Sequence, residues 1–123
     1  MNDNNDTLSV VRAYHRGWTT KHFDEATRLL SADLKIEVPI NTYATAEAFA
    51  KAIAAFGSRT TQVDLLAEFA HGDQAMLLYD MDVQGLATMR VAEHFTIDHG
   101  QITRIRQIHD TAALRAAGFG ETK

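Results

Sequence analysis

The alternating run at residues 89–97 constrains the fold more than any other part of this chain. Four of its five odd-numbered positions carry large apolar side chains, and the fifth carries Glu93. Alternate side chains of a strand lie on one face, so this run predicts a strand whose core-facing side contains a single acid. An ionised carboxylate is costly to bury unless it is paired, and otherwise it stays neutral. We therefore expect Glu93 to be either a functional group or one half of a buried polar contact.

Helical patterns fill most of the first half of the chain. The first predicted helix begins after Asp6 or Thr7, either of which could cap it. Two more are expected over residues 22–30 and 46–56, and Thr45 is well placed to cap the last of them. Each has apolar residues at helical spacing along one side, which favours packing against a common partner.

Strand-like alternation occurs once before the third helix and four times after it. The segments are residues 34–38, 63–69, 77–83, 89–97 and 101–109. Short turns join the last four segments, which predicts antiparallel neighbours, and Asp110 could cap a final short helix. Helices on one face of a curved antiparallel sheet make an α+β architecture. We predict a single domain over residues 1–123, with flexible ends at 1–6 and 119–123.

The composition excludes several classes of function. The chain has no cysteine, so disulfides, thiol nucleophiles and thiolate metal sites are ruled out. The net charge is −4 without a basic cluster, which argues against nucleic acid or an anionic membrane as partner. No two histidines have the spacing of a helical zinc site, and we expect neither a metal nor another cofactor. The polar, acidic N-terminus and the lack of a long apolar run predict a cytoplasmic protein.

The apolar faces of the predicted helices and strands would meet on the concave side of the sheet. The candidates to line a ligand cavity there are Trp18, Val38, Phe56, Leu65, Tyr79, Met81, Val91, Phe95 and Gln107. The same residues would form ordinary core if they packed without a void, and both interpretations stay open. The candidates for chemistry are Tyr14, Glu93 and His109.

The last predicted strand has two ways to face the core. Arg104 and Arg106 are expected to point outward, because unpaired guanidinium groups rarely enter a core, and this places Gln107 and His109 inside. An imidazole titrates near neutral pH, so His109 could act as a general base. The alternative is that His109 is a hydrogen-bonded residue at the rim.

The order of elements and several local motifs resemble the nuclear transport factor 2-like, or SnoaL-like, superfamily. The motifs are residues 11–14 (Val-Arg-Ala-Tyr), 23–26 (Phe-Asp-Glu-Ala), 34–39 (ending in Pro39), 93–97 (Glu-His-Phe-Thr-Ile) and 100–102 (Gly-Gln-Ile). This superfamily includes ketosteroid isomerases, polyketide cyclases and limonene epoxide hydrolases. The resemblance implies a cone-shaped, cystatin-like α+β roll with the sheet wrapped around three N-terminal helices. It also implies a homodimer.

The resemblance further implies roles for individual residues. Tyr14 and Glu93 fall where ketosteroid isomerases carry the two groups of their oxyanion hole, the second of which is a carboxylic acid kept neutral by an apolar site. Val38 falls at the position of the isomerase base, and Gln107 falls at the position of an essential aspartate in the hydrolases and cyclases. Neither side chain can accept a proton. Glu93 is expected within hydrogen-bond reach of Tyr14 or of a ligand.

Two hypotheses follow from these observations. In the first, the chain binds a small hydrophobic carbonyl or phenolic ligand, with Tyr14 and Glu93 on the ligand oxygen. If it is an enzyme, it is an isomerase, lyase or cyclase acting next to a carbonyl, with His109 or a ligand group as base. In the second, it is a non-catalytic ligand-binding or dimerisation module of the same fold.

Overall fold

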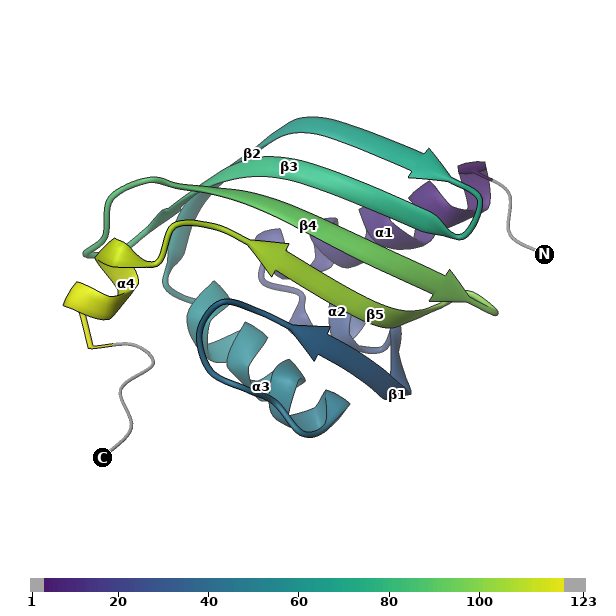
Figure 1. Cartoon of the computed structure of the whole chain (residues 1–123), viewed down its shortest axis with the longest axis horizontal. Helices are drawn as coiled ribbons and strands as arrows, with labels where there is room; N and C mark the ends of the chain where they lie inside the picture. The colour runs from purple at the N-terminus through teal and green to yellow at the C-terminus, as the bar shows by residue number, and fades with distance from the viewer. Residues whose placement is uncertain (1–3, 119–123) are drawn as a thin grey trace.

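The computed structural model describes residues 4–118 and places helices on one side of a five-stranded sheet (Figure 1). The helices are α1 (Asn4–Thr19), α2 (Phe23–Thr27), α3 (Ala46–Gly57) and α4 (Ala112–Ala116). The strands are β1 (Leu30–Glu37), β2 (Thr60–His71), β3 (Gln74–Val83), β4 (Met89–Asp98) and β5 (Gln101–Ile108). Across the sheet the strand order is β1-β5-β4-β3-β2, so the four strands from β2 to β5 form successive hairpins. The α+β class expected from the sequence is confirmed.

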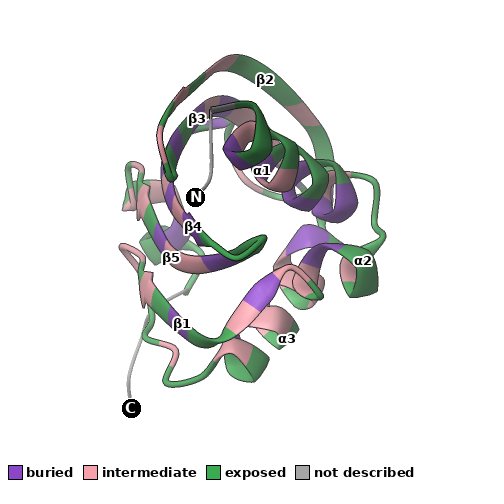
Figure 2. Cartoon of the chain, turned by 90° about the vertical axis from the view of Figure 1, so that its right-hand side faces the viewer, coloured by how far each residue is buried: buried purple, intermediate pink, exposed green. Residues whose placement is uncertain are grey.

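The sheet is mixed rather than wholly antiparallel. Strand β1 pairs in parallel with β5, with Ile36 beside Ile105 in the register. A parallel neighbour requires a long crossover, and the whole chain between β1 and β5 supplies one. Figure 2 shows the sheet curving around α1, α2 and α3, as expected for a sheet wrapped around three N-terminal helices.

The ends of several elements differ from those expected. Helix α1 begins at Asn4, so part of the terminal segment expected to be flexible is helical, while residues 119–123 lie outside the described residues. Helix α2 ends at Thr27, before the expected residue 30. The reason is strand pairing, because the backbone carbonyl of Leu29 accepts a hydrogen bond of 2.8 Å from the backbone N–H of Ile102.

Close packing and capping position the helices against the sheet. The Thr45 hydroxyl accepts a hydrogen bond of 3.0 Å from the backbone N–H of Ala48, as expected for the cap of α3. Gly17 lets α1 approach α2, because a Cβ at this position would lie 2.8 Å from the Cβ of Ala26. This approach fixes how α1 lies across the concave face.

The core stripe of β4 has the alternation that the sequence predicted. Every second residue from Met89 to Ile97 is buried, and Glu93 among them is 1% exposed. The pattern breaks on β5, because the register with β4 shifts beside Ile97. As a result Ile102 and Ile105 are both buried although they are three positions apart.

Candidate functional site

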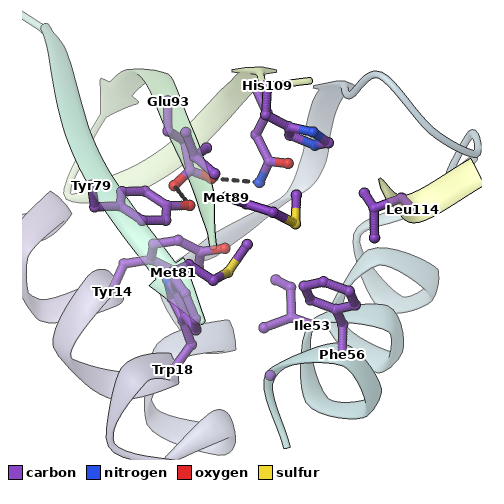
Figure 3. A pocket seen from close by; sticks show the side chains of 13 residues that line it. Tyr14, Trp18, Ile53, Phe56, Tyr79, Met81, Met89, Glu93, His109 and Leu114 are labelled. Atoms are coloured by element: carbon purple, nitrogen blue, oxygen red, sulfur yellow. Dashed lines mark hydrogen bonds between the residues drawn. The ribbon is translucent and has the colours of Figure 1, made fainter. Parts of the chain in front are cut away.

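A cavity of about 90 Å³ lies between the helices and the sheet. Its wall comes from α1, α3, β3, β4, β5 and α4, and most of the lining is apolar. Figure 3 shows three oxygen-bearing side chains, Tyr14, Tyr79 and Glu93, gathered at one end of it. The opposite end is formed by Ile53, Phe56 and Leu114 and carries no polar side chain in this view (Figure 3).

The Glu93 carboxyl is held at the polar end by two hydrogen bonds from neighbouring strands. The Tyr79 hydroxyl donates to Oε1 at 3.0 Å, and the Gln107 side-chain amide donates to Oε2 at 2.8 Å (Figure 3). The sheet register explains both contacts, because Gln107 lies directly opposite Glu93 on β5. On β3, Leu77 lies opposite Glu93, so Tyr79 is its diagonal neighbour on the same face.

Burial and hydrogen bonding shift the pKa of this carboxyl in opposite directions. Burial disfavours the charged form and raises the pKa of Glu93 from 4.5 to about 7, while the hydrogen bonds from Gln107 and Tyr79 lower it. The carboxyl therefore exists in both protonation states near neutral pH. A group with such a pKa can donate or accept a proton at little cost.

Tyr14 contributes a second polar group to the same end of the cavity. Its ring packs edge-on against Phe95, with the ring centroids 5.8 Å apart. Burial, followed by the nearby Glu93 carboxyl, raises the pKa of Tyr14 well above its usual value, so the hydroxyl keeps its proton. Within residues 4–118 the Tyr14 hydroxyl makes no hydrogen bond, and Glu93 is bonded to Tyr79 in place of Tyr14. The Tyr14 hydroxyl is thus a donor available to a ligand.

Aromatic packing fixes the position of Tyr79. Its ring lies 4.9 Å from that of His15 and 5.9 Å from that of Trp18, measured between centroids. Burial lowers the pKa of His15 to about 4, so this imidazole is neutral at physiological pH. Burial, followed by the charge of Glu93, raises the pKa of Tyr79 well above its usual value. Tyr79 therefore acts as a neutral hydroxyl.

His109 lies in the cavity wall just beyond β5. Its Nδ1 atom is 3.0 Å from the backbone carbonyl oxygen of Asp110. A carbonyl oxygen can only accept, so Nδ1 carries the proton, and in the neutral ring Nε2 then has a free lone pair. This tautomer makes Nε2 the basic atom.

The cavity wall includes all three residues expected to carry chemistry and most of those expected to bind a ligand. The predicted residues found in it are Tyr14, Trp18, Phe56, Tyr79, Met81, Val91, Glu93, Gln107 and His109. Their roles stay predictions. Three residues expected in the wall lie elsewhere. Phe95 is fully buried in the core, Leu65 is 43% exposed on a groove beside α1, and Val38 lines a groove beside β5.

Four residues that the sequence did not single out also line the cavity. They are Ile53, Gly57, Met89 and Leu114. The alternation of β4 could have identified Met89, which shares its face with Glu93. Ile53 belongs to the apolar stripe of α3 and could have been found in the same way. Leu114 reaches the cavity only because α4 folds back over it, and no local pattern signals that contact.

The described part of the chain has no metal cluster and no membrane-spanning candidate. No group of three or more acidic, histidine or cysteine side chains within residues 4–118 is arranged to hold a metal ion. No helix in the same range is long and apolar enough to cross a membrane.

Comparison with known proteins assigns the family. A model of the SnoaL-like domain matches residues 11–105, and the chain belongs to that family. A crystal structure from Kribbella flavida shares 30% identity with a TM-score of 0.81, covering 89% of this chain and 91% of that one. No functionally curated protein matches the sequence.

Two enzymes share the fold at low sequence identity. An LEH-like epoxide hydrolase from M. tuberculosis has 18% identity and a TM-score of 0.75, covering 94% of this chain and 90% of that one. A steroid delta-isomerase from Pseudomonas aeruginosa has 16% identity and a TM-score of 0.76, covering 92% of this chain and 86% of that one. At these identities the likeness shows the fold alone, so the chemistry has to be argued from the residues of the cavity.

Proposed function

We propose that this chain binds a small, mostly apolar molecule through a carbonyl or phenolic oxygen. The observation that carries the proposal is the polar end of the cavity. There an unbonded Tyr14 hydroxyl lies near a Glu93 carboxyl whose pKa is about 7. Donors in a dry site stabilise an oxygen on which negative charge develops. The apolar wall would hold the rest of the ligand.

The reaction that this arrangement supports is proton transfer next to a carbonyl group. The Nε2 atom of His109 would take the proton from the carbon beside the carbonyl. The polar end of the cavity would then stabilise the resulting enolate oxygen. Return of the proton to another carbon completes an isomerisation. His109 is the base because its Nε2 lone pair is free, whereas both oxygens of Glu93 already accept hydrogen bonds and neither Val38 nor Gln107 can accept a proton.

The size of the cavity limits the ligand. An apolar cavity of roughly 150 Å³ holds a benzene ring, whereas this cavity measures about 90 Å³. Met81 and Met89 lie in its wall, and methionine side chains are unbranched and adapt their shape readily. A single six-membered ring is therefore the largest ligand that we expect without movement of the backbone.

Calorimetric titration with matched ligands tests this proposal. Phenol and benzene have the same ring, as do 4-methylphenol and toluene, and only the phenols carry the oxygen. At about pH 5.5, where Glu93 is mostly neutral, the phenols should bind several-fold more tightly than their partners. The preference should fall in Tyr14→Phe, which keeps the ring and removes the unbonded hydroxyl, and should be largely kept in Glu93→Gln, whose side chain does not ionise. Equal affinity across each pair would exclude the proposal.

A second candidate function is self-association through the outer face of the sheet. Phe69 on β2 is 68% exposed, and its register partner Met76 on β3 is 40% exposed. Met76 in turn lies opposite His94 on β4, so the three form one row across the sheet. Adjacent exposed apolar side chains such as Phe69 and Met76 favour an interface with a second copy. Light scattering should show a dimer that Phe69→Asp converts to a monomer, and a wild-type monomer would exclude this candidate.

A further inference from the structure

The proposed function rests on an oxygen bound at the polar end of the cavity, and the structure shows which side chains can reach it. We infer that Tyr79, rather than Glu93 itself, gives the second hydrogen bond to the bound oxygen. A proton on Glu93 turns the Tyr79 hydroxyl toward the cavity. Glu93 is then a positioning residue, and Tyr79 determines which ligands bind.

Both oxygens of the Glu93 carboxyl are already occupied by donors. Oε2 accepts from the Gln107 amide at 2.8 Å, and Oε1 accepts from the Tyr79 hydroxyl at 3.0 Å. This arrangement satisfies an ionised carboxylate, which has four lone-pair sites and no proton to donate. In that state the Tyr79 proton is used inside the wall and is not available to a ligand.

Protonation of Glu93 changes the direction of one of these hydrogen bonds. A proton on Oε2 would face the N–H group of Gln107, and two donors cannot share one hydrogen bond. The proton therefore resides on Oε1 and is donated to the Tyr79 oxygen. The Tyr79 hydroxyl must then point its own proton elsewhere.

The surroundings of Tyr79 leave the cavity as the place for that proton. The rings of His15 and Trp18 pack against the Tyr79 ring, each at an interplanar angle of 58°. Tyr79 also lines the cavity, and its hydroxyl lies at the same end as that of Tyr14 (Figure 3). Two hydroxyl donors, from Tyr14 and Tyr79, then face one ligand oxygen.

Few other titratable side chains lie around the Glu93 carboxyl. Helix α1 contributes Tyr14 and β3 contributes Tyr79, and both keep their protons because burial raises their pKa values. The chain after β5 contributes His109 to the same cavity, while α3 and α4 present only apolar side chains there. His15 lies beyond Tyr79 and is neutral above a pH of about 4, its pKa. Glu93 and His109 are therefore the two groups to separate by experiment.

Binding of cyclohexenone, compared with cyclohexene, tests the inference. Cyclohexenone has a carbonyl oxygen that does not ionise, so any pH dependence belongs to the protein. Binding can be followed by the methyl NMR signals of Met81 and Met89, which line the cavity. The affinity for cyclohexenone divided by the affinity for cyclohexene should be about five-fold higher at about pH 5.5 than at about pH 8.5. A factor of this size is the effect of one neutral hydrogen bond.

Two conservative variants assign the effect to Tyr79 and Glu93. In Glu93→Gln, the new carbonyl can accept from Gln107 and the new amide can donate to Tyr79, so the Tyr79 hydroxyl faces the cavity at every pH. This variant should prefer cyclohexenone at about pH 8.5 as strongly as the wild type does at about pH 5.5. Tyr79→Phe keeps the ring and should show the weak preference at both pH values.

The outcomes separate this inference from the proposed function. If pH dependence survives in both Tyr79→Phe and His109→Gln, Glu93 donates directly and the inference is wrong although the site binds the oxygen. If it is lost in His109→Gln but kept in Tyr79→Phe, His109 is the titrating group, and the inference is again wrong. If the wild type prefers cyclohexenone equally at both pH values, the Tyr79 hydroxyl does not turn with pH and the inference is wrong. If it never prefers cyclohexenone, the proposed function itself fails.

The infrared carbonyl stretch of bound cyclohexenone gives an independent readout. Each added hydrogen bond weakens the carbonyl bond and lowers its stretching frequency. The frequency should fall between high and low pH in the wild type and stay constant in both variants. If Tyr79→Phe showed the same change in frequency between high and low pH as the wild type, the inference would be contradicted. A tyrosine with only a structural role could be replaced without altering this pH-dependent change.

Discussion

Gln107 donates a hydrogen bond of 2.8 Å to Glu93 across β5 and β4, where the two residues lie directly opposite each other. The resemblance to the epoxide hydrolases and cyclases had placed an essential aspartate at the position of Gln107. An amide here cannot act as a base, but it stabilises the ionised form of the neighbouring acid. The pKa of Glu93 thus reflects burial partly offset by two donors.

Removing the amide should raise the pKa of Glu93 further above 7. In Gln107→Leu the carboxyl stays buried and loses a donor that favours its charged form. NMR titration of the Glu93 side-chain carboxyl carbon would measure the change. Gln101→Leu is the matched control, because Gln101 is an exposed glutamine on the same strand. An equal or lower pKa in Gln107→Leu would show that the amide does not stabilise the carboxylate.

The raised pKa of Glu93 also predicts how stability depends on pH. The folded state holds this proton more tightly than the unfolded chain, so the contribution is present below pH 4.5 and is lost as the pH rises through about 7. A shift from 4.5 to about 7 corresponds to about 3 kcal/mol.

Denaturant unfolding across this pH range, with Glu93→Gln as reference, isolates the effect. The wild type should lose stability relative to Glu93→Gln as the pH rises, because glutamine does not ionise. Parallel stability curves for the two proteins would mean that the pKa of Glu93 is the same in the folded and unfolded states.

The contact between α1 and α2 should not tolerate a larger residue than glycine. In Gly17→Ala the new Cβ would lie 2.8 Å from the Cβ of Ala26 and 3.0 Å from two of its backbone atoms. Backbone cannot yield as a flexible side chain does, so we expect a loss of about 1–3 kcal/mol in the free energy of unfolding. Ala13→Ser, at an exposed position of the same helix, should change it by about 0.5 kcal/mol or less. Equal stability of the two variants would refute this reading of the helix contact.

The protein should not isomerise a β,γ-unsaturated ketosteroid. Val38 lies where the resemblance places the isomerase base, and it lines a groove outside the cavity. A cavity of about 90 Å³ is also too small for a four-ring molecule. A spectrophotometric assay for the conjugated product should show only the uncatalysed rate, and rapid turnover would mean that the cavity opens far more widely.

The sequence predicted the burial of Glu93 but not its partners. Alternation in residues 89–97 is a local signal, and it determines which face of β4 each side chain occupies. The choice of Tyr79 over Tyr14 depends on the register between β3 and β4, which no single segment encodes. The register shift beside Ile97 likewise made both Ile102 and Ile105 buried, against simple alternation on β5.

Contacts between parts of the chain that are distant in sequence were harder still to predict. The apolar face of α1 correctly indicated that Tyr14 and Trp18 would be buried. The direction of β1 and the folding back of α4, which brings Leu114 to the cavity, depend on tertiary packing. Val38 and Leu65 were expected in the cavity, but Val38 lies just after β1 and Leu65 lies beside a register shift of β2, and each lines a different surface.

The most direct test of the central claim is an NMR titration of the Glu93 carboxyl carbon with and without cyclohexenone. The free protein should titrate with a pKa of about 7. The bound protein should titrate higher, because a ligand that binds the neutral form more tightly holds its proton in place. A pKa near the ordinary 4.5 in the free protein, or an identical pKa in both samples, would contradict the account of Glu93 as the group that prepares this cavity for an oxygen-bearing ligand.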